Sequence, residues 1–288
     1  MFNNELFRKG RTVYSFEVFP PKKTMNIEKV TGAIDELVKL SPDYVSVTYG
    51  AGGSIKDNRT VEICKRINST STISPVAHVT CVGATKADID VLMADLIEIG
   101  VENILALRGD LTGELSGDFA HASDLAKYIN EKYPNKFCIG GACYPVGHVE
   151  SDSLEEDMDN LKKKVDSGVK YLTTQLFFDN NELYDFLERA EKAGLNVPIN
   201  CGIMPLTNSK QIERMVSMSG ASVPQKLSKL IGRYVDNPEC MREAGLLYAT
   251  EQIVDLLASG VDGIHLYTMN NPYVASKITA NVKSLLGR

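Results

Sequence analysis

The chain lacks the features that mark membrane proteins, metal-cluster proteins and nucleic-acid-binding proteins. No apolar run approaches the length of a membrane span, and the first ten residues, M-F-N-N-E-L-F-R-K-G, contain no apolar signal core. The six cysteines are scattered without a C-x-x-C pair, which predicts reduced thiols in a cytoplasmic protein and argues against a zinc or iron–sulfur site. The net charge of −6 argues against nucleic acid as a partner.

What remains is the composition of an ordinary globular protein. Of the 288 residues, 24% are charged and 43% are hydrophobic. This length suffices for one large α/β domain that buries roughly three quarters of the surface of its unfolded chain. Because the chain is acidic overall, an anionic ligand needs local positive charge or the N-terminus of a helix.

Segments typical of strands and helices alternate about eight times along the chain. Short runs rich in β-branched residues predict strands over residues 13–19, 43–48, 75–81, 102–107, 136–143, 170–175, 197–202 and 263–267. Apolar positions at helical spacing predict helices over residues 26–40, 56–67, 86–99, 122–132, 154–167, 182–193, 209–218, 223–232, 238–259 and 273–286. The helices near 209–218 and 223–232 are additions between the seventh and eighth strands.

This alternation is typical of an α/β fold of the (β/α)₈ TIM barrel class. No linker or change of composition divides the chain, so we expect residues 1–288 to form a single domain. A doubly wound open sheet is the competing architecture, but no G-x-G-x-x-G fingerprint follows the first strand. We therefore predict the barrel.

One acidic residue is out of place in the first strand. The run V-Y-S-F-E-V-F-P-P begins at Val13, and its two prolines end the strand because neither can donate to a sheet ladder. Alternation puts Glu17 on one face with Val13, Ser15 and Phe19. A carboxylate inside an apolar strand is desolvated, which predicts a raised pKa suited to proton donation. The alternative is a glutamate that turns to solvent or pairs with a lysine.

Nearly every other strand also delivers a polar group to its carboxyl end, where the active site of a barrel lies. These residues, together with the backbone at 202–205, are Glu17, Thr48, His78, Asp110, Tyr144, Gln175 and Tyr267. Each has a structural alternative. Thr48 and Tyr49 could cap a turn, His78 could be a hydrogen-bonded core histidine, and Arg108-Gly109-Asp110 could be a surface turn. His121 and His265 show no pattern that we can interpret.

The ordered motifs of the chain resemble one family. They are S-F-E-V-F-P-P, V-S-V-T-Y-G-A, H-V-T-C, L-A-L-R-G-D, A-C-Y-P, L-K-K-K-V-D-S-G, T-T-Q-L-F-F-D, G-I-M-P and Y-T-M-N. As a set they are similar to the bacterial, single-barrel type of methylenetetrahydrofolate reductase, and the resemblance covers residues 15–286. It implies a flavoprotein of one-carbon metabolism and methionine biosynthesis, in which FAD bound to the barrel reduces methylenetetrahydrofolate to methyltetrahydrofolate.

The resemblance also implies roles for individual residues. Glu17 matches the general acid that assists opening of the methylene bridge, and Asp110 matches an aspartate beside the flavin that makes it a readier hydride donor. Gln175 and Tyr267 match folate-contacting positions. The positions that match those around FAD are Thr48, Tyr49, His78, Leu107, Arg108, Gly109, Asp110, Ala122, Tyr144, His148, Asp157 and Lys164. No metal is implied.

The implied mechanism is ping-pong, with the donor and the folate using the same flavin in turn. The electron donor is NADH or NADPH or, as in some relatives, a partner subunit, and the family often forms homo-oligomers. Three positions depart from the motifs. Ser209 stands where an aromatic residue is common, Asn271 stands where an arginine is common, and the H-P-E signature reads His148-Val149-Glu150.

Two other functions remain open from the sequence. One is a pterin-binding barrel that transfers a methyl group to a cobalamin or a thiol, which would need neither flavin nor a proton from Glu17. The other is a flavin- or folate-binding subunit that relays electrons inside a larger complex.

Overall fold

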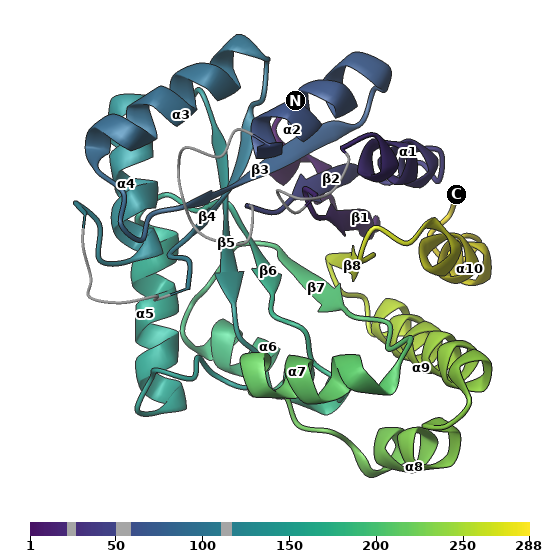
Figure 1. The fold of residues 1–288 in the computed structure, drawn as a ribbon. Coiled ribbons are helices and arrows are strands. Elements are labelled where there is room, and N and C mark those ends of the chain that lie inside the picture. The colour runs from purple at the N-terminus through teal and green to yellow at the C-terminus, as the bar shows by residue number, and fades with distance from the viewer. Residues whose placement is uncertain (22–26, 50–58, 111–116) are drawn as a thin grey trace.

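A computed structural model describes residues 1–21, 27–49, 59–110 and 117–288. Eight parallel strands close into a barrel in the order β1 to β8, which confirms the predicted fold class (Figure 1). The strands are β1 (Val13–Val18), β2 (Tyr44–Val47), β3 (Ser74–Thr80), β4 (Asn103–Leu107), β5 (Cys138–Cys143), β6 (Tyr171–Thr174), β7 (Ile199–Ile203) and β8 (Gly263–Tyr267).

The helices surround the barrel, and each prediction has its counterpart among them. They are α1 (Ile27–Val38), α2 (Arg59–Thr70), α3 (Lys86–Glu98), α4 (Ala122–Lys132), α5 (Leu154–Asp166), α6 (Asn180–Lys192), α7 (Ser209–Ser219), α8 (Gln225–Tyr234), α9 (Pro238–Ala258) and α10 (Pro272–Val282). As expected, α7 and α8 are additional helices between β7 and β8. A short 3₁₀ helix, η1 (Asn3–Leu6), was not predicted. The expected residues 26 and 56–58 of two helices lie outside the described part of the chain.

Capping side chains explain where several helices begin. The side chain of Asp179 accepts a hydrogen bond from Asn181 N, so α6 begins at Asn180 rather than at the predicted residue 182. Asn237 and Asn271 cap α9 and α10 in the same way, each followed by a proline at the first helical position. Asn271, which departs from the family motif, therefore has a structural role at the start of α10.

Alternation along the strands separates the outer core from the barrel interior. Tyr14, Phe16 and Val18 of β1 point outward and pack in the main hydrophobic cluster. The inward-facing residues near the amino ends of the strands form a second cluster, which we call the lower plug. It consists of Leu6, Val13, Tyr44, Val76, Leu105, Cys138 and Tyr171. Phe2 and Phe7, which flank η1, pack against it and close that end of the barrel.

Toward the carboxyl ends, the interior of the barrel becomes polar. The next inward positions carry hydroxyl, amide, imidazole and carboxyl groups, all of them buried. We call this group the polar layer; it consists of Ser15, Glu17, Ser46, His78, Asn200 and His265. Tyr44 joins the two halves, since its ring belongs to the lower plug and its hydroxyl accepts a hydrogen bond from Asn200 Nδ2 at 2.7 Å.

Within the described residues, no helix is long and apolar enough to cross a membrane. All six cysteines are free thiols, and five of them are buried. Burial raises the pKa of the Cys81 and Cys138 thiols to about 11, so both are protonated near neutral pH.

Candidate active site

The carboxyl ends of the strands surround a cavity of about 460 Å³, which we call the mouth cavity. Because parallel barrel strands all end on one side, residues far apart in the sequence line it together. The predicted site residues that line it are Glu17, His78, Leu107, Arg108, Gly109, Asp110, Tyr144, His148, Gln175 and Tyr267. Its polar lining and its position correspond to those of a barrel active site.

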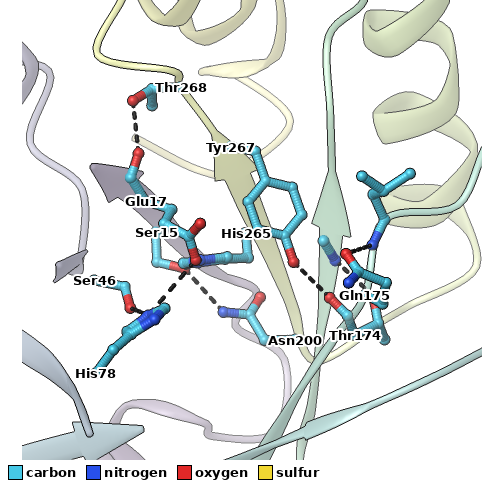
Figure 2. A network of polar contacts seen from close by, with 12 residues as sticks. Ser15, Glu17, Ser46, His78, Thr174, Gln175, Asn200, His265, Tyr267 and Thr268 are labelled. Atoms are coloured by element: carbon cyan, nitrogen blue, oxygen red, sulfur yellow. Dashed lines mark hydrogen bonds and ion pairs between the residues drawn. The ribbon is translucent and has the colours of Figure 1, made fainter. Parts of the chain in front are cut away.

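Glu17 is the buried carboxyl of this cavity, with 8% of its surface exposed. Thr268 fixes its backbone, because Thr268 Oγ1 donates a hydrogen bond to the Glu17 carbonyl oxygen at 2.7 Å. The carboxyl oxygen Oε2 lies 3.6 Å from His78 Nε2 and 3.5 Å from His265 Nε2 (Figure 2). Glu17 therefore does not turn to solvent, and it pairs with no lysine in the described part of the chain.

His265 is the principal site residue that the sequence did not reveal. It is fully buried, and its Nδ1 lies 2.7 Å from Ser15 Oγ. Its Nε2 faces Glu17 Oε2, is sealed from solvent and has no hydrogen-bond partner in the described part of the protein. Strand alternation could have predicted it, since His265 stands two residues before Tyr267 and so faces the barrel interior as Tyr267 does.

His78 is both a hydrogen-bonded core histidine and a residue of the site. Its Nε2 lies 2.6 Å from Ser46 Oγ, and 5% of its surface is exposed. Burial lowers the pKa of His78 to about 4, against a smaller opposing effect of Glu17, so the imidazole is neutral near pH 7. No group of three or more His, Cys, Asp or Glu side chains in the described ranges could hold a metal ion.

Tyr267 and Gln175 form another part of the wall. The Tyr267 hydroxyl donates to the Thr174 carbonyl oxygen at 2.7 Å, and burial raises the pKa of this phenol well above its ordinary value. Gly202 leaves room for the ring, since a Cβ at that position would lie 2.7 Å from it. The side-chain carbonyl of Gln175 accepts from Leu176 N at 2.9 Å. That bond orients the Gln175 amide at the cavity.

A neighbouring cavity of about 370 Å³, the side cavity, opens between the ends of β4 and β5 and the first turns of α4 and α5. The predicted residues that line it are Leu107, Arg108, Ala122, Tyr144, His148, Asp157 and Lys164. Leu107, Arg108, Tyr144 and His148 line both cavities, so the two adjoin. One elongated ligand could therefore occupy both.

Lys164 supplies positive charge to the side cavity. Its Nζ donates to the Ala142 carbonyl oxygen at 2.7 Å and lies 5.9 Å from the centre of the Tyr144 ring. Burial lowers the pKa of Lys164, and the opposing effects of Cys143 and Asp157 are smaller. An ammonium has three N–H donors, so Lys164 has donors available for an anionic group in the side cavity.

Asp157 is held at the first turn of α5. Its Oδ1 accepts from His148 N at 3.2 Å and from Ser151 Oγ at 3.3 Å. A carboxylate at a helix N-terminus is stabilised by the helix dipole. This carboxylate suits the hydroxyl groups of a sugar rather than a second anion.

The Arg108-Gly109-Asp110 turn forms the wall between the cavities. Arg108 does not pair with Asp110 but donates to both carboxylate oxygens of Glu150, at 2.6 and 2.7 Å. This guanidinium holds the pKa of Glu150 below its usual range. Gly109 has φ +92°, and a Cβ there would lie 2.9 Å from Val82 Cγ1. Asp110 is exposed at the rim of the mouth cavity.

Two predicted cofactor residues line neither cavity in the part of the chain that the structure describes. Thr48 is buried, and its carbonyl oxygen accepts from Thr60 Oγ1 at 2.9 Å. Tyr49 is partly buried and packs against the main hydrophobic cluster. The glycine-rich loop at 50–58 that follows them, and the side chain of Ser209, lie outside the described residues. These assignments stay predictions.

Fold and site together define a (β/α)₈ barrel that binds ligands at the carboxyl ends of its strands. The family model described as methylenetetrahydrofolate reductase matches residues 3–283. The 5,10-methylenetetrahydrofolate reductase of Escherichia coli K12 is 34% identical over 262 residues, which cover 91% of this chain and 88% of that protein. The chain belongs to the methylenetetrahydrofolate reductase family.

Other relatives are longer than this chain. Methylenetetrahydrofolate reductase (NADH) 1 of Arabidopsis thaliana is 35% identical over 289 residues, which cover 95% of this chain but 49% of the plant protein. The chain thus spans about half the length of the plant and yeast relatives that it matches. Among solved structures, a Clostridium thermocellum protein described as binding two copies of 5-methyl-5,6,7,8-tetrahydrofolic acid has a TM-score of 0.68 at 15% identity, with both chains fully covered. At that identity the likeness concerns the fold alone.

Proposed function

We propose that this chain reduces 5,10-methylenetetrahydrofolate to 5-methyltetrahydrofolate, with FAD as cofactor and NADH as electron donor. The observation that carries the proposal is the buried carboxyl of Glu17, which lines the mouth cavity between two imidazoles. In a chain of this family, that carboxyl is the group suited to give a proton to a folate nitrogen. The name of the Arabidopsis relative includes NADH, which supports the choice of donor.

The chemistry of the two cavities fits FAD. Lys164, whose pKa burial lowers, suits the pyrophosphate, and Asp157 suits ribose hydroxyl groups. Tyr144 and Leu107 line both cavities and offer flat and apolar surface to the remainder of the cofactor. When bound, FAD would supply hydride chemistry, accepting two electrons from the donor and delivering them to the folate. Asp110, at the rim of the mouth cavity, would disfavour the anionic reduced form.

Glu17 would act as the general acid. Its proton passes to the folate nitrogen that leaves the methylene carbon; the C–N bond breaks, and its electron pair remains on that nitrogen. The carbon, now part of an iminium ion, accepts a hydride and becomes the methyl group. Gln175 and Tyr267 would orient the pterin beside Glu17, because both line the same cavity.

The mouth cavity supports a ping-pong order. The flavin ring of FAD would take part of its volume of about 460 Å³, which leaves room for the donor or for the folate rather than for both together. The donor would therefore leave before the folate enters.

The proposal is tested by following the visible absorption of the FAD-loaded protein without oxygen. Addition of NADH should bleach the flavin band, and methylenetetrahydrofolate should then restore it. If NADH leaves the band unchanged, dithionite reduction followed by the folate isolates the second half-reaction. Recovery of the band in that second test would keep the folate-reducing function and reject NADH as the donor. Failure of the dithionite-reduced protein to react with the folate would overturn the proposal.

A further inference from the structure

One imidazole bridges the two inward-facing polar residues of β1. Residues two apart on a strand share a face, so Ser15 and Glu17 both point into the barrel. Parallel pairing of β1 with β8 sets Ser15 opposite His265 and Glu17 opposite Tyr267. As a result, Nδ1 of His265 lies 2.7 Å from Ser15 Oγ while Nε2 of the same ring lies 3.5 Å from Glu17 Oε2.

The hydrogen bonds around Ser15 define which ring nitrogen carries the hydrogen. Asn200 Nδ2 donates to Ser15 Oγ at 2.9 Å, so the Ser15 hydroxyl proton is free to be donated elsewhere. Its two acceptors are His265 Nδ1 at 2.7 Å and the Ile264 carbonyl oxygen at 3.5 Å, and the shorter contact favours Nδ1. When Nδ1 of a neutral imidazole accepts, Nε2 bears the hydrogen. That N–H points toward Glu17.

The surroundings keep the ring in this orientation. Tyr44 stacks on the imidazole at 6.0 Å between ring centres, and Tyr267 meets it edge-on at 5.4 Å. Asn200, which holds Ser15, donates its other amide hydrogen to the Tyr44 hydroxyl at 2.7 Å. Gly263 leaves space for Asn200, since a Cβ there would lie 2.5 Å from Asn200 Oδ1. Rotation of the ring would therefore require several buried groups to move.

We propose that His265 is a positioning residue for the proton of Glu17. Its Nε2–H faces Oε2, the same oxygen that His78 faces, and thereby keeps the transferable proton on the other oxygen, Oε1, for the substrate. The inference rests on the proposed role of Glu17 as general acid. It adds a buried relay of Ser15, Asn200 and Tyr44 that sets the tautomer of His265.

Among the residues that the structure describes, the ionisable groups closest to Glu17 are few. His78 approaches from β3, and His265 and Tyr267 from β8. Tyr44 of β2 meets the far side of the His265 ring. The pKa of His78 is about 4, and those of Tyr44 and Tyr267 are raised, to about 12 for Tyr44, so all three are neutral between pH 6 and 9. A change of the pH profile in that range therefore does not arise from these three groups.

The test measures the folate half-reaction of FAD-loaded, dithionite-reduced protein from pH 6 to pH 9. His265→Gln keeps an N–H donor near the position of Nε2, whereas His265→Phe keeps an aromatic ring at this position but has neither ring nitrogen. We expect His265→Phe to lower the rate about ten-fold and to shift the alkaline limb of the profile upward by about half a pH unit or more. His265→Gln should keep most of the rate. A packing role predicts the reverse order, with Phe the better substitute, and that order would overturn the inference.

Tyr14→Phe is the matched control. Tyr14 lies on the same strand, and its hydroxyl makes a buried 2.9 Å hydrogen bond to Thr279 on the outer face. This variant should lose some stability and keep both the wild-type rate and the wild-type pH profile. If wild-type protein does not oxidise with the folate at all, the proposed function fails; if wild type reacts and both His265 variants match it, only this inference fails.

A second measurement does not depend on turnover. The chain has four histidines, so ¹⁵N-labelled histidine gives few ring signals in a long-range ¹H–¹⁵N spectrum. Loss of one set in His265→Gln assigns the residue. We expect the hydrogen on Nε2, and in Ser15→Ala a mixture of tautomers. A hydrogen on Nδ1 in the wild-type protein would contradict the proposed orientation of the Glu17 proton.

Discussion

The lower plug and the polar layer occupy the same barrel and share strands β1, β2 and β3, yet they are held together differently. Below, Leu6, Val13 and Val76 pack apolar surface against the rings of Tyr44 and Tyr171. Above, buried polar groups depend on one another for hydrogen bonds, as His265 depends on Ser15 and Ser15 on Asn200. Apolar burial stabilises without direction, whereas a buried polar group is stable only with a correctly placed partner.

The difference assigns stability to one half and chemistry to the other. Lower-plug residues that line neither cavity and contact no polar-layer residue, such as Leu6, need only volume and apolarity, so losing one should weaken the fold and leave the site unchanged. Polar-layer residues keep unused hydrogen-bonding capacity; His265 Nε2 and Asn200 Oδ1 have no hydrogen-bond partner in the described part of the chain. Such groups cost stability and are tolerated where function needs them.

The largest expected effect is chemical and lies in the polar layer. Glu17→Gln keeps the shape of the side chain and removes the acidic proton, so the folate half-reaction should slow by about 10²–10⁴-fold. FAD binding and dithionite reduction should be unchanged, because Glu17 makes no hydrogen bond through its side chain to other described residues. Stopped-flow oxidation of the reduced flavin measures the effect. Undiminished folate turnover would end the general-acid assignment.

The next effect is on stability and lies in the lower plug. Leu6→Ala removes a buried side chain, 5% exposed, from the closed end of the barrel. We expect a loss of about 2–5 kcal/mol in the free energy of unfolding. The rate of the folate half-reaction per FAD-loaded molecule should stay within about two-fold of wild type, because Leu6 lines neither cavity. Urea denaturation together with that rate tests the division between a stabilising lower plug and a chemically active polar layer. A large loss of rate at full FAD loading would contradict that division.

The polar layer should make stability depend on pH in a defined window. His78 has a pKa of about 4 in the folded protein and about 6.5 when unfolded, so the unfolded chain binds more protons between these values. Stability is therefore full above pH 6.5 and is lost as the pH falls toward 4, by about 3 kcal/mol in total. Urea midpoints across this range measure the slope. His78→Gln should flatten it, and an equal slope in that variant would assign the dependence to other groups.

Much of this architecture follows from local sequence. Each strand and its following helix have their own periodicity, and the anomaly of Glu17 is visible within the six residues of β1. The predicted starts of helices were less accurate where a capping side chain determines the start, as Asp179 does for α6. The barrel itself follows because eight such units in a row have few other ways to bury their strands.

The contacts of the polar layer could not be predicted in the same way. His265 and Ser15 are 250 residues apart in the sequence and meet only because β8 closes on β1 in one register. The sequence around Gly140 likewise does not predict its role, yet a Cβ at Gly140 would lie 2.6 Å from the Tyr171 ring. Closure of the barrel, rather than local conformational propensity, determines both the contact of His265 with Ser15 and the space that requires glycine at position 140. Residues such as Glu17 were found because their neighbours in sequence made them anomalous.

The smallest expected effect distinguishes the two halves most finely, because it compares two interior tyrosines. Both are buried, but the Tyr44 hydroxyl accepts from Asn200, whereas the Tyr171 hydroxyl has no hydrogen-bond partner in the described ranges. Tyr44→Phe should cost about 1 kcal/mol and leave Asn200 with an unpaired donor, whereas Tyr171→Phe should be neutral or slightly stabilising. Urea denaturation of the two variants gives the difference. Equal losses would mean that the hydrogen bond to the polar layer contributes nothing to stability, and the boundary between the halves would then lie above Tyr44.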